Sequence, residues 1–340
     1  MTEFDQHLLD IIQDAFPLEE RPYQVLADML NARGSAGEPP RESFTEQQVF
    51  ENVEKLRNSG VIRRLGGIYD SHRLGFISRL CAGKVPTVAT GASDDSALEK
   101  FAAAANEIPA ITHNYLRTHD YNVWFTVIAQ SEDEICSVVD KLCSETDLHD
   151  VHILSVTKKF KIDTVMKLDE RRKTKDERDG SALRRGSGQA LAGISCASLS
   201  SSDKARIRTA CTDIPHMLTP YADWGVSLDE LREDLVQKRM RRFGAVLRHQ
   251  QAGFAYNAMV CFDALADAGA ALAKNPHVSH CYERPAFEGF PYTLYAMMHA
   301  QSAAELEEYI KDAARSIGNP GYAVLHSVRE LKKTSFKFFA

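Results

Sequence analysis

The chain has 340 residues, of which 26% are charged and 44% hydrophobic, which is the composition of an ordinary globular protein long enough for two or more domains. Its formal net charge of −6 gives no general reason to expect nucleic acid or an anionic membrane as a partner. The seven scattered cysteines form no Cys-x-x-Cys pair, and no apolar stretch approaches the ~20 residues that cross a bilayer, so we expect a cytoplasmic protein without a metal site or a membrane segment.

The first part of the chain predicts three helices followed by a small β-wing. Apolar residues recur at helical spacing before Pro17, again after Pro22, and a third time up to a Gly60 cap. The alternating stretch 61–69 then predicts a short hairpin around two adjacent glycines. Three short helices and a wing are typical of a winged helix-turn-helix, which we expect over residues 1–74.

Residues 75–166 alternate between strand and helix patterns. Strand-like apolar runs and Ala-rich or amphipathic stretches follow one another in the order βαββαβ, which is typical of a ferredoxin-like domain. The predicted strands cover 75–85, 110–117, 121–129 and 151–160, and the predicted helices cover 93–105 and 131–143.

The second half of the chain repeats this plan. Residues 167–203 are charged at first and then rich in Gly, Ser and Ala, and we interpret them as a flexible linker. Residues 204–252 predict a second, irregular winged helix-turn-helix, because Pro215 and Pro220 interrupt it, and 253–340 predict a second ferredoxin-like domain. The expected third helix covers 227–240, the wing 241–248, the strands 254–262, 278–284, 292–300 and 322–329, and the other helices 265–274 and 303–317. The fold class is therefore α+β, as a tandem duplication.

Short motifs return at matching places in the two halves, which supports the duplication. Arg-Arg-x-Gly (with Gly at the fourth position) occurs at each wing, and His-x-Tyr-x-Arg occurs on the second strand of each βαββαβ unit, followed by a strand with Tyr-x-x-aromatic. The repeated residues are Arg63, Arg64, His113, Tyr115, Arg117, Tyr121 and Trp124 in the first half, and Arg241, Arg242, His280, Tyr282, Arg284, Tyr292 and Tyr295 in the second.

The His-x-Tyr-x-Arg motif places three chemically different groups on one side of a strand, because alternate residues share a face. An imidazole carries a proton near neutral pH, a phenol is a weaker acid, and a guanidinium is a fixed cation. In a purely structural role, Tyr would pack, His would cap a neighbour and Arg would reach solvent. Two copies in matching places favour a chemical role over this alternative.

The Arg-Arg pairs lie at the wings, where basic residues usually contact DNA phosphates. The predicted third helices nevertheless carry net negative charge. Three acidic and two basic residues give 45–60 a net charge of −1, and four acidic and three basic residues give 227–240 the same value. Both helices would repel a phosphate backbone, so sequence-specific DNA binding is the weaker interpretation.

A winged helix followed by βαββαβ resembles the Lrp/AsnC transcription regulators. The Arg-Arg-x-Gly wing, the His-x-Tyr-x-Arg strand and the Tyr-x-x-aromatic strand resemble, more specifically, siroheme decarboxylases, which are Lrp/AsnC-like enzymes, usually of two related subunits. Both subunits would here be fused, and the resemblance covers nearly all of the chain outside the linker. Seven residues separate Arg284 from Tyr292, against three between Arg117 and Tyr121, so the two sites need not be equivalent.

The resemblance implies non-oxidative decarboxylation of siroheme. Two acetate side chains, on rings C and D, would become methyl groups and give didecarboxysiroheme, for haem d1 or for alternative haem biosynthesis. Siroheme is then the partner and brings its own iron, so no further cofactor is implied and no specific DNA is expected. The two halves would pair within the chain, and a further homodimer stays open. The alternatives are a DNA-binding regulator and a non-catalytic haem or tetrapyrrole sensor.

The resemblance also implies roles for individual residues. A histidine would deliver the proton or, instead, ligate the iron of the substrate, while arginines grip carboxylates and aromatic rings face the macrocycle. The catalytic group consists of His113, Tyr115, Arg117, His280, Tyr282 and Arg284. The substrate-binding group consists of Arg63, Arg64, Arg241, Arg242, Arg248, His249, Tyr121, Trp124, Tyr292 and Tyr295.

Overall fold

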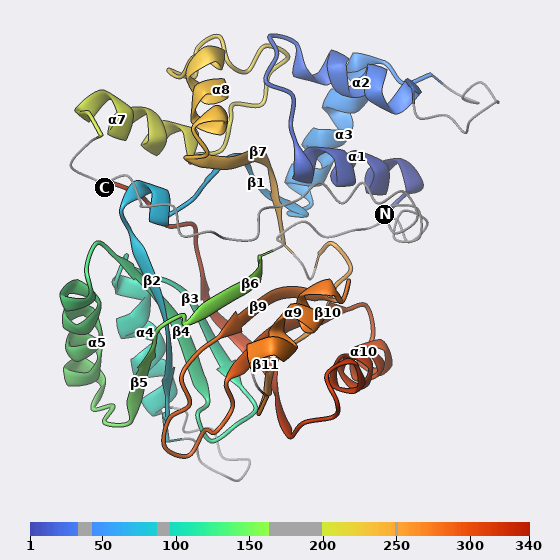
Figure 1. Ribbon diagram of the computed structural model, residues 1–340. Helices are drawn as coiled ribbons and strands as arrows, with labels where there is room; N and C mark the ends of the chain where they lie inside the picture. The colour runs from blue at the N-terminus through green and yellow to red at the C-terminus, as the bar shows by residue number, and fades with distance from the viewer. Residues whose placement is uncertain (33–42, 87–95, 163–198, 249–250, 265) are drawn as a thin grey trace.

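The computed structural model describes residues 1–32, 43–86, 96–162, 199–248, 251–264 and 266–340. The two N-terminal parts of the duplicated units form a helical layer, and the strands of both units form a β layer beneath it (Figure 1). The helical layer contains α1 (Glu3–Asp14), α2 (Pro22–Ala32), α3 (Glu46–Asn58), β1 (Ile62–Tyr69), α7 (Ser201–Ala210), α8 (Leu228–Val236) and β7 (Met240–Leu247).

The helices of this layer begin at side-chain caps and bury one apolar face. Thr2, Thr45 and Ser227 each accept a hydrogen bond from the third backbone N–H of the following helix, in capping boxes. The core of the layer joins residues of both halves, such as Leu26 of α2 and Leu231 of α8, which are both fully buried. The two winged-helix units therefore share one core rather than folding around separate ones.

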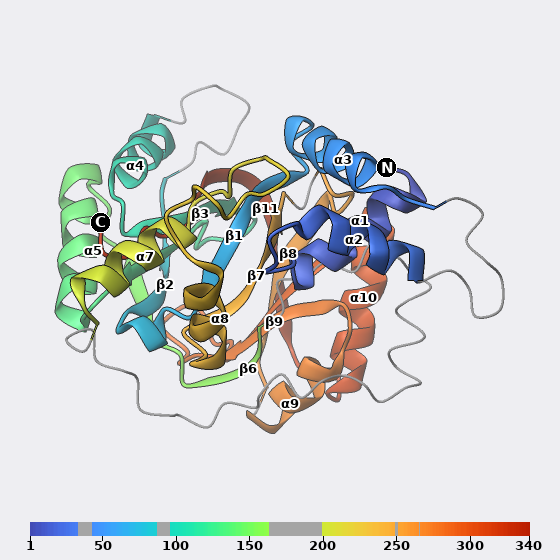
Figure 2. The same cartoon turned by 90° about the horizontal axis from the view of Figure 1, so that it is seen from above.

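Each wing is a single strand, and the two wings pair with each other. β1 and β7 run antiparallel, with Gly66 opposite Gly244, and they lie between α1–α3 and the α7–α8 pair (Figure 2). These two glycines hold the same place in the repeated motif, so an approximate two-fold axis passes between them. The hairpin predicted over 61–69 is wrong, because Gly66-Gly67 makes no turn. A Cβ atom on Gly66 would lie 2.3 Å from the carbonyl oxygen of Thr212, so glycine is needed there for close approach to a helix end.

The second winged-helix unit is less regular than the first. α7 and α8 correspond to α1 and α3, but the stretch between them consists of turns and bends instead of a helix. Trp224 and Tyr221 from this stretch pack against Phe243 of β7. The helix expected over 227–240 ends earlier, at Val236, because Lys238 adopts a left-handed conformation with φ of 58° and the chain then enters β7.

The β layer consists of two ferredoxin-like units joined edge to edge. If the four strands of one βαββαβ unit are counted along the chain, they lie side by side in the order 4-1-3-2. This order is β5-β2-β4-β3 in the first unit and β11-β8-β10-β9 in the second. The first unit contains β2 (Ile77–Gly83), α4 (Ser96–Glu107), β3 (Ile111–Arg117), β4 (Val123–Ala129), α5 (Glu132–Thr146), β5 (Val151–Leu154) and β6 (Lys158–Ile162), after the short 3-10 helix η1 (His72–Leu74). The second contains β8 (Tyr256–Phe262), α9 (Ala266–Lys274), β9 (Val278–Glu283), β10 (Leu294–Ala300), α10 (Ala303–Ser316) and β11 (Tyr322–Lys333).

The fourth strand of each unit extends onto the other unit. β11 pairs with β8 through Tyr322–His326 and then with β3 of the first unit through Ser327–Lys333. The single strand predicted over 151–160 is in fact two: β5 pairs within its own unit, whereas β6 pairs with β9 of the second. The two exchanges are equivalent, so the predicted pairing of the two halves within one chain is confirmed.

Three apolar clusters stabilise the β layer. α4 and α5 cover the outer side of the strands of the first unit, and α9 and α10 cover that of the second (Figure 1). An apolar core lies between each pair of helices and its strands. A third cluster joins residues of both units, among them Trp124, Phe290 and Tyr295. Of the predicted linker, residues 167–198 lie outside the described part, and its last three residues begin α7.

Candidate functional site

The first His-x-Tyr-x-Arg motif lies on β3, and β11 of the other half completes its face. His113 lies opposite Lys333, and Tyr115 lies opposite Glu330. The hydroxyl of Tyr115 donates a hydrogen bond of 3.4 Å to the Glu330 carboxylate. Arg117 ends the strand and is only 6% exposed. We call these residues the first face; it contains residues of both halves.

The second motif lies on β9 and the residue that follows it. His280 lies opposite Ile162 and Tyr282 opposite Lys159, both on β6 of the first half. Arg284 is 8% exposed, and its guanidinium lies over the ring of Tyr282 at 5.3 Å from the centroid. Arg117 lies over Tyr115 in the same way, at 5.1 Å. This second face therefore repeats the geometry of the first.

The two buried arginines reach across the axis between the halves. Arg117 donates to the carbonyl of Leu325 at 3.1 Å and to the hydroxyl of Ser327 at 2.9 Å, and Arg284 donates to the carbonyl of Leu154 at 2.7 Å. Among the described residues neither guanidinium has a carboxylate partner, and each keeps a buried Nε without a hydrogen-bond partner. A buried cation without an anion is costly, so a carboxylated ligand would relieve both sites.

The first arginine of each wing lies above one face. Arg63 of β1 donates to the backbone carbonyl of Lys333 at 3.5 Å. Burial lowers the pKa of Arg63, and the nearby phenol of Tyr115 acts in the opposite direction. Burial also raises the pKa of Tyr282, and the guanidinium of Arg241 is among the cations that oppose this shift. Arg63 therefore belongs to the first face. Arg241 lies on the side of the second face, where its guanidinium also lies 3.8 Å from the carboxylate of Asp70.

The second arginine of each wing points into the helical layer. Arg64 donates to the carbonyl of Cys211 at 2.6 Å, at the end of α7, and Arg242 donates to the carbonyl of Gln13, at the end of α1. The last carbonyls of a helix lack partners within it and attract cations. The structure thus gives these two predicted substrate ligands helix-end partners, on the opposite side of the strand from Arg63 and Arg241.

The predicted aromatic surfaces are mostly interior. Tyr121, Trp124 and Tyr295 are buried in the cluster between the two units, and only Tyr292 is partly exposed. The hydroxyl of Tyr121 donates to the carbonyl of Glu288 at 3.0 Å, and the indole N–H of Trp124 donates to the carbonyl of Tyr121 at 2.7 Å. These side chains shape the interior behind the two faces and present little free ring surface.

Burial, helped by nearby cations, keeps the imidazole of His113 neutral. Burial, with Lys333, Arg63 and His280 acting in the same direction, lowers the pKa of His113 to about 4. Burial lowers the pKa of Arg117 to about 10, so this arginine is still a cation at neutral pH.

Sequence reasoning did not identify three charged residues of the faces. Glu330 and Lys333 come from β11 and Lys159 from β6, and each lies in the half opposite to the motif that it faces. None stands in a repeated motif. The sequence signal for them is the alternating pattern that predicts β6 and β11 as strands. That pattern does not show that either strand pairs with a strand of the other half.

Two further predicted residues follow β7. Arg248 is exposed, and its backbone N–H donates to the carbonyl of Val61 at 3.0 Å. The pKa of Arg63 is lowered mainly by burial, and Arg248 is among the nearby cations that lower it further. It therefore lies near the first face. His249 lies outside the described residues.

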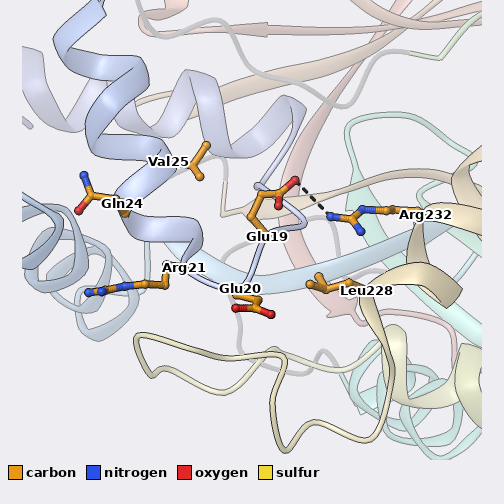
Figure 3. A pocket seen from close by; sticks show the side chains of 7 residues that line it. All are labelled: Glu19, Glu20, Arg21, Gln24, Val25, Leu228 and Arg232. Atoms are coloured by element: carbon orange, nitrogen blue, oxygen red, sulfur yellow. Dashed lines mark hydrogen bonds and ion pairs between the residues drawn. The ribbon is translucent and has the colours of Figure 1, made fainter.

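The structure also has a surface hollow between the start of α2 and α8 (Figure 3), which contains no motif residue. Arg232 reaches across it to the carboxylate of Glu19 at 3.2 Å. Within the described ranges, no group of three or more His, Cys, Asp or Glu side chains is arranged to hold a metal ion. No helix of that same part is long and apolar enough to cross a membrane.

Comparison with known families matches both parts of the duplicated plan. The AsnC-like ligand binding domain matches residues 73–161 and 251–332, and the siroheme decarboxylase NirDL-like HTH domain matches 5–34. A siroheme decarboxylase of Hydrogenobacter thermophilus is 31% identical over 352 aligned positions, covering 100% of this chain and 96% of the relative.

Proteins of about half the length are also similar. The siroheme decarboxylase alpha subunit of Desulfovibrio desulfuricans is 39% identical over 50% of this chain and 86% of its own length, and the beta subunit is 36% identical over 40% and 94%. A crystal structure of the siroheme decarboxylase NirDL in complex with an iron-uroporphyrin III analogue has a TM-score of 0.65 and 28% identity, covering 100% of this chain and 95% of that one. The expected resemblance is thereby confirmed: this chain belongs to the siroheme decarboxylase family.

Proposed function

We propose that this chain catalyses the non-oxidative decarboxylation of siroheme. Two acetate side chains, on rings C and D, lose carbon dioxide and become methyl groups, which makes the protein a carboxy-lyase that produces didecarboxysiroheme. The similarity to siroheme decarboxylases over the whole chain supports this activity. So does the NirDL structure with an iron-uroporphyrin III analogue, because that ligand is also an iron tetrapyrrole.

One observation about the site supports the proposal most. Arg117 and Arg284 are buried cations, and neither has a carboxylate partner among the described residues. Arg63 and Arg241 add a guanidinium above each face. Siroheme is a flat apolar disc edged with carboxylates, and guanidinium groups bind carboxylates strongly through paired hydrogen bonds. The faces therefore suit a ligand that brings several anionic groups to one place.

The reaction requires little beyond orientation and one proton for each step. When the bond between the methylene carbon and the carboxylate breaks, carbon dioxide leaves and the electron pair stays on the methylene carbon. The conjugated macrocycle of the substrate spreads this charge, and an acid of the protein then protonates the carbon to give the methyl group. No oxidant or reductant is consumed. The iron belongs to the substrate, and we infer no further cofactor.

The motif residues divide this work between them. His113 or His280 is the proton donor, Tyr115 or Tyr282 assists it, and the arginine of the same motif holds a neighbouring carboxylate. An imidazole can donate a proton to carbon only when it carries that proton. Because His113 is neutral in the free protein, it becomes a donor only when substrate carboxylates offset the nearby cations and raise its pKa.

One chain forms one catalytic unit in this proposal. The β1–β7 pair and the two strand exchanges already join the halves as an alpha and a beta subunit would be joined. The described cysteines are all free, which is consistent with the reducing cytoplasm that we propose as its compartment.

DNA binding has no comparable support. The cations of α3 are engaged, because Arg57 pairs with Asp213 at 3.0 Å and Lys55 lies 3.7 Å from the carboxylate of Asp5. The acidic residues of α8 remain at the equivalent place in the second half. A helix of this kind offers phosphates no free positive charge.

The proposal is tested by anaerobic incubation of the purified full chain with siroheme, followed by mass spectrometry of the tetrapyrrole. We expect two successive losses of carbon dioxide. Binding of siroheme without any loss would instead identify a tetrapyrrole sensor. Tight, sequence-specific binding of duplex DNA at physiological salt, with no turnover, would identify a regulator.

A further inference from the structure

The guanidinium of Arg117 is held at one end by two acceptors of the other half. Its Nη1 donates to the carbonyl of Leu325 at 3.1 Å and to the hydroxyl of Ser327 at 2.9 Å. Ser327 also lies directly opposite Arg117 in the pairing of β3 with β11. A guanidinium Nη1 carries two hydrogens, so both are used by these acceptors.

The other edge of the same guanidinium keeps its donors. Within the described part of the chain, Nε of Arg117 is buried without a hydrogen-bond partner, and Nη2 contacts the thioether sulfur of Met297 at 3.9 Å, a weak acceptor. The N–H groups of Nε and Nη2 are parallel, and such a pair matches the two oxygens of a carboxylate. An arginine fixed at Nη1 therefore leaves the edge that suits a carboxylate.

The hydroxyl of Ser327 is itself held in place. It accepts from Arg117 and donates to Oδ1 of Asn257 on β8 at 2.6 Å. A hydroxyl donates one hydrogen bond and accepts others, so both contacts are satisfied together. The three side chains form a chain of hydrogen bonds that fixes the position of the hydroxyl oxygen.

The passage of β11 from one unit to the other does not depend on this hydroxyl. Beside it, the backbone N–H of Thr118 donates to the carbonyl of His326 at 3.1 Å, and the N–H of His326 donates to the hydroxyl of Thr118 at 2.9 Å. The matching position in the other exchange, two residues after the carbonyl that binds Arg284, is Val156. β5 and β6 thus make the equivalent exchange without a hydroxyl there.

We propose that Ser327, oriented by Asn257, is a positioning residue that orients Arg117 for binding a carboxylate of siroheme. The inference rests on the proposed function, in which Arg117 holds a substrate carboxylate. A loosely held arginine side chain loses rotational freedom when it binds a ligand, and this loss weakens binding. The contact with Ser327 orders the guanidinium before the substrate arrives, so siroheme binds more tightly.

The test measures siroheme affinity by absorbance titration of the full chain. We expect Ser327→Val, which introduces the side chain found at the matching position, to weaken binding by about three- to tenfold, the usual cost of ordering one side chain on binding. Ser327→Thr keeps the hydroxyl and should bind as the wild type does. Thr118→Val is the matched control, because it removes a hydroxyl from the same crossing that does not contact Arg117, and its affinity should be unchanged.

A double-mutant cycle separates positioning from a structural role. Arg117→Gln should weaken siroheme binding, and Ser327→Val should then have no further effect, because no guanidinium is left to orient. Urea unfolding checks that each variant is folded, and Asn257→Ala takes the place of Ser327→Val in the cycle if that variant does not fold.

Three results would overturn the inference. They are an unchanged affinity in Ser327→Val or in Arg117→Gln, an equal loss in Thr118→Val, and a loss from Ser327→Val that persists in full without Arg117.

Failure of the proposed function would be seen separately. If the wild-type chain binds siroheme without releasing carbon dioxide, the proposed function fails, and the affinities of the cycle still decide the role of Ser327. In a chain that releases carbon dioxide, Ser327→Val should raise KM by a larger factor than it lowers kcat, since the hydroxyl acts on binding. The reverse pattern would contradict the inference.

Discussion

Adjacent arginines of each wing do different work because successive residues of a strand point to opposite sides. Arg63 faces the sheet and interacts with Tyr115, whereas Arg64 donates to the last carbonyls around α7. Arg241 and Arg242 repeat this division in the second wing. A guanidinium on one side can bind a carboxylate, while the other one holds the strand to the helical layer.

This division predicts opposite effects for neighbouring substitutions. Arg241→Ala should weaken siroheme binding at least about tenfold, since it removes a charge-assisted pair of roughly 1.5–3 kcal/mol, with little effect on unfolding. Arg242→Ala should lower the free energy of unfolding and leave the affinity of the folded protein nearly unchanged. Absorbance titration and urea unfolding measure the two quantities. Equal effects of both substitutions on affinity would contradict the assignment.

The low pKa of His113 predicts a pH dependence of stability. The folded protein binds a proton at His113 only near pH 4, whereas an unfolded histidine does so near 6.5, so the unfolded chain binds more protons between these values. The contribution of His113 is therefore complete above about pH 6.5 and is lost as the pH falls towards 4. Urea unfolding from pH 7 to pH 4 should show a shallower loss of stability in His113→Asn than in wild type. Parallel curves would place His113 in a different environment.

At the scale of the elements, the contact between β1 and the end of α7 depends on a missing side chain. A Cβ atom on Gly66 would meet the carbonyl oxygen of Thr212 at 2.3 Å, and one on Gly244 would meet that of Ile12 at 2.6 Å. Both obstacles are backbone atoms, which cannot swing aside as a flexible side chain can. The repeated glycine of the wing motif thus serves packing between layers.

We expect Gly66→Ala to destabilise the fold by about 1–3 kcal/mol, as overpacking of a close contact usually does. Gly321→Ala is the control, because a Cβ atom there has no neighbour within 4 Å and the backbone needs no positive φ. Thermal unfolding of the two variants gives the comparison. A variant at Gly66 that is as stable as the control would show that the strand and the helix end do not approach this closely.

Much of the element pattern follows from local signals in the sequence. The periodicity of 75–166 predicts the order βαββαβ because each strand and helix buries one face within its own unit. The exchange of β6 was not predictable, since its pairing with β9 depends on contacts between residues more than a hundred positions apart. The alternation in 61–69 correctly indicates an extended strand, but two adjacent glycines are as typical of a turn as of a close contact.

The motif residues of the candidate site could be predicted from the sequence, but the orientation of the wing arginines could not. The repeated His-x-Tyr-x-Arg motifs are identifiable because strand alternation fixes which side chains share a face. Arg64 and Arg242 could not be separated from Arg63 and Arg241, because the orientation of the wings depends on the pairing of β1 with β7. Tyr121 and Trp124 were expected at a ligand surface, but the contact between the two units buries them.

At the scale of the whole molecule, each half completes the other. The domain limits remain a prediction from composition, with the linker over 167–203, and limited proteolysis tests them. We expect trypsin to cut first within this range and to give two fragments that separate on a denaturing gel. Because β6, β11 and the β1–β7 pair cross between the halves, the fragments should stay together in gel filtration. Early cleavage inside either βαββαβ unit would contradict the limits, and separation of the fragments would contradict the pairing.

The central claim is that this one chain replaces two acetate carboxyl groups of siroheme with hydrogen delivered by its own acids. The most direct measurement is the mass of the tetrapyrrole after anaerobic turnover in deuterated water. The account predicts two losses of carbon dioxide and one deuterium retained in each new methyl group, since imidazole and phenol protons exchange with solvent. Siroheme recovered unchanged, or decarboxylated without deuterium, would contradict it.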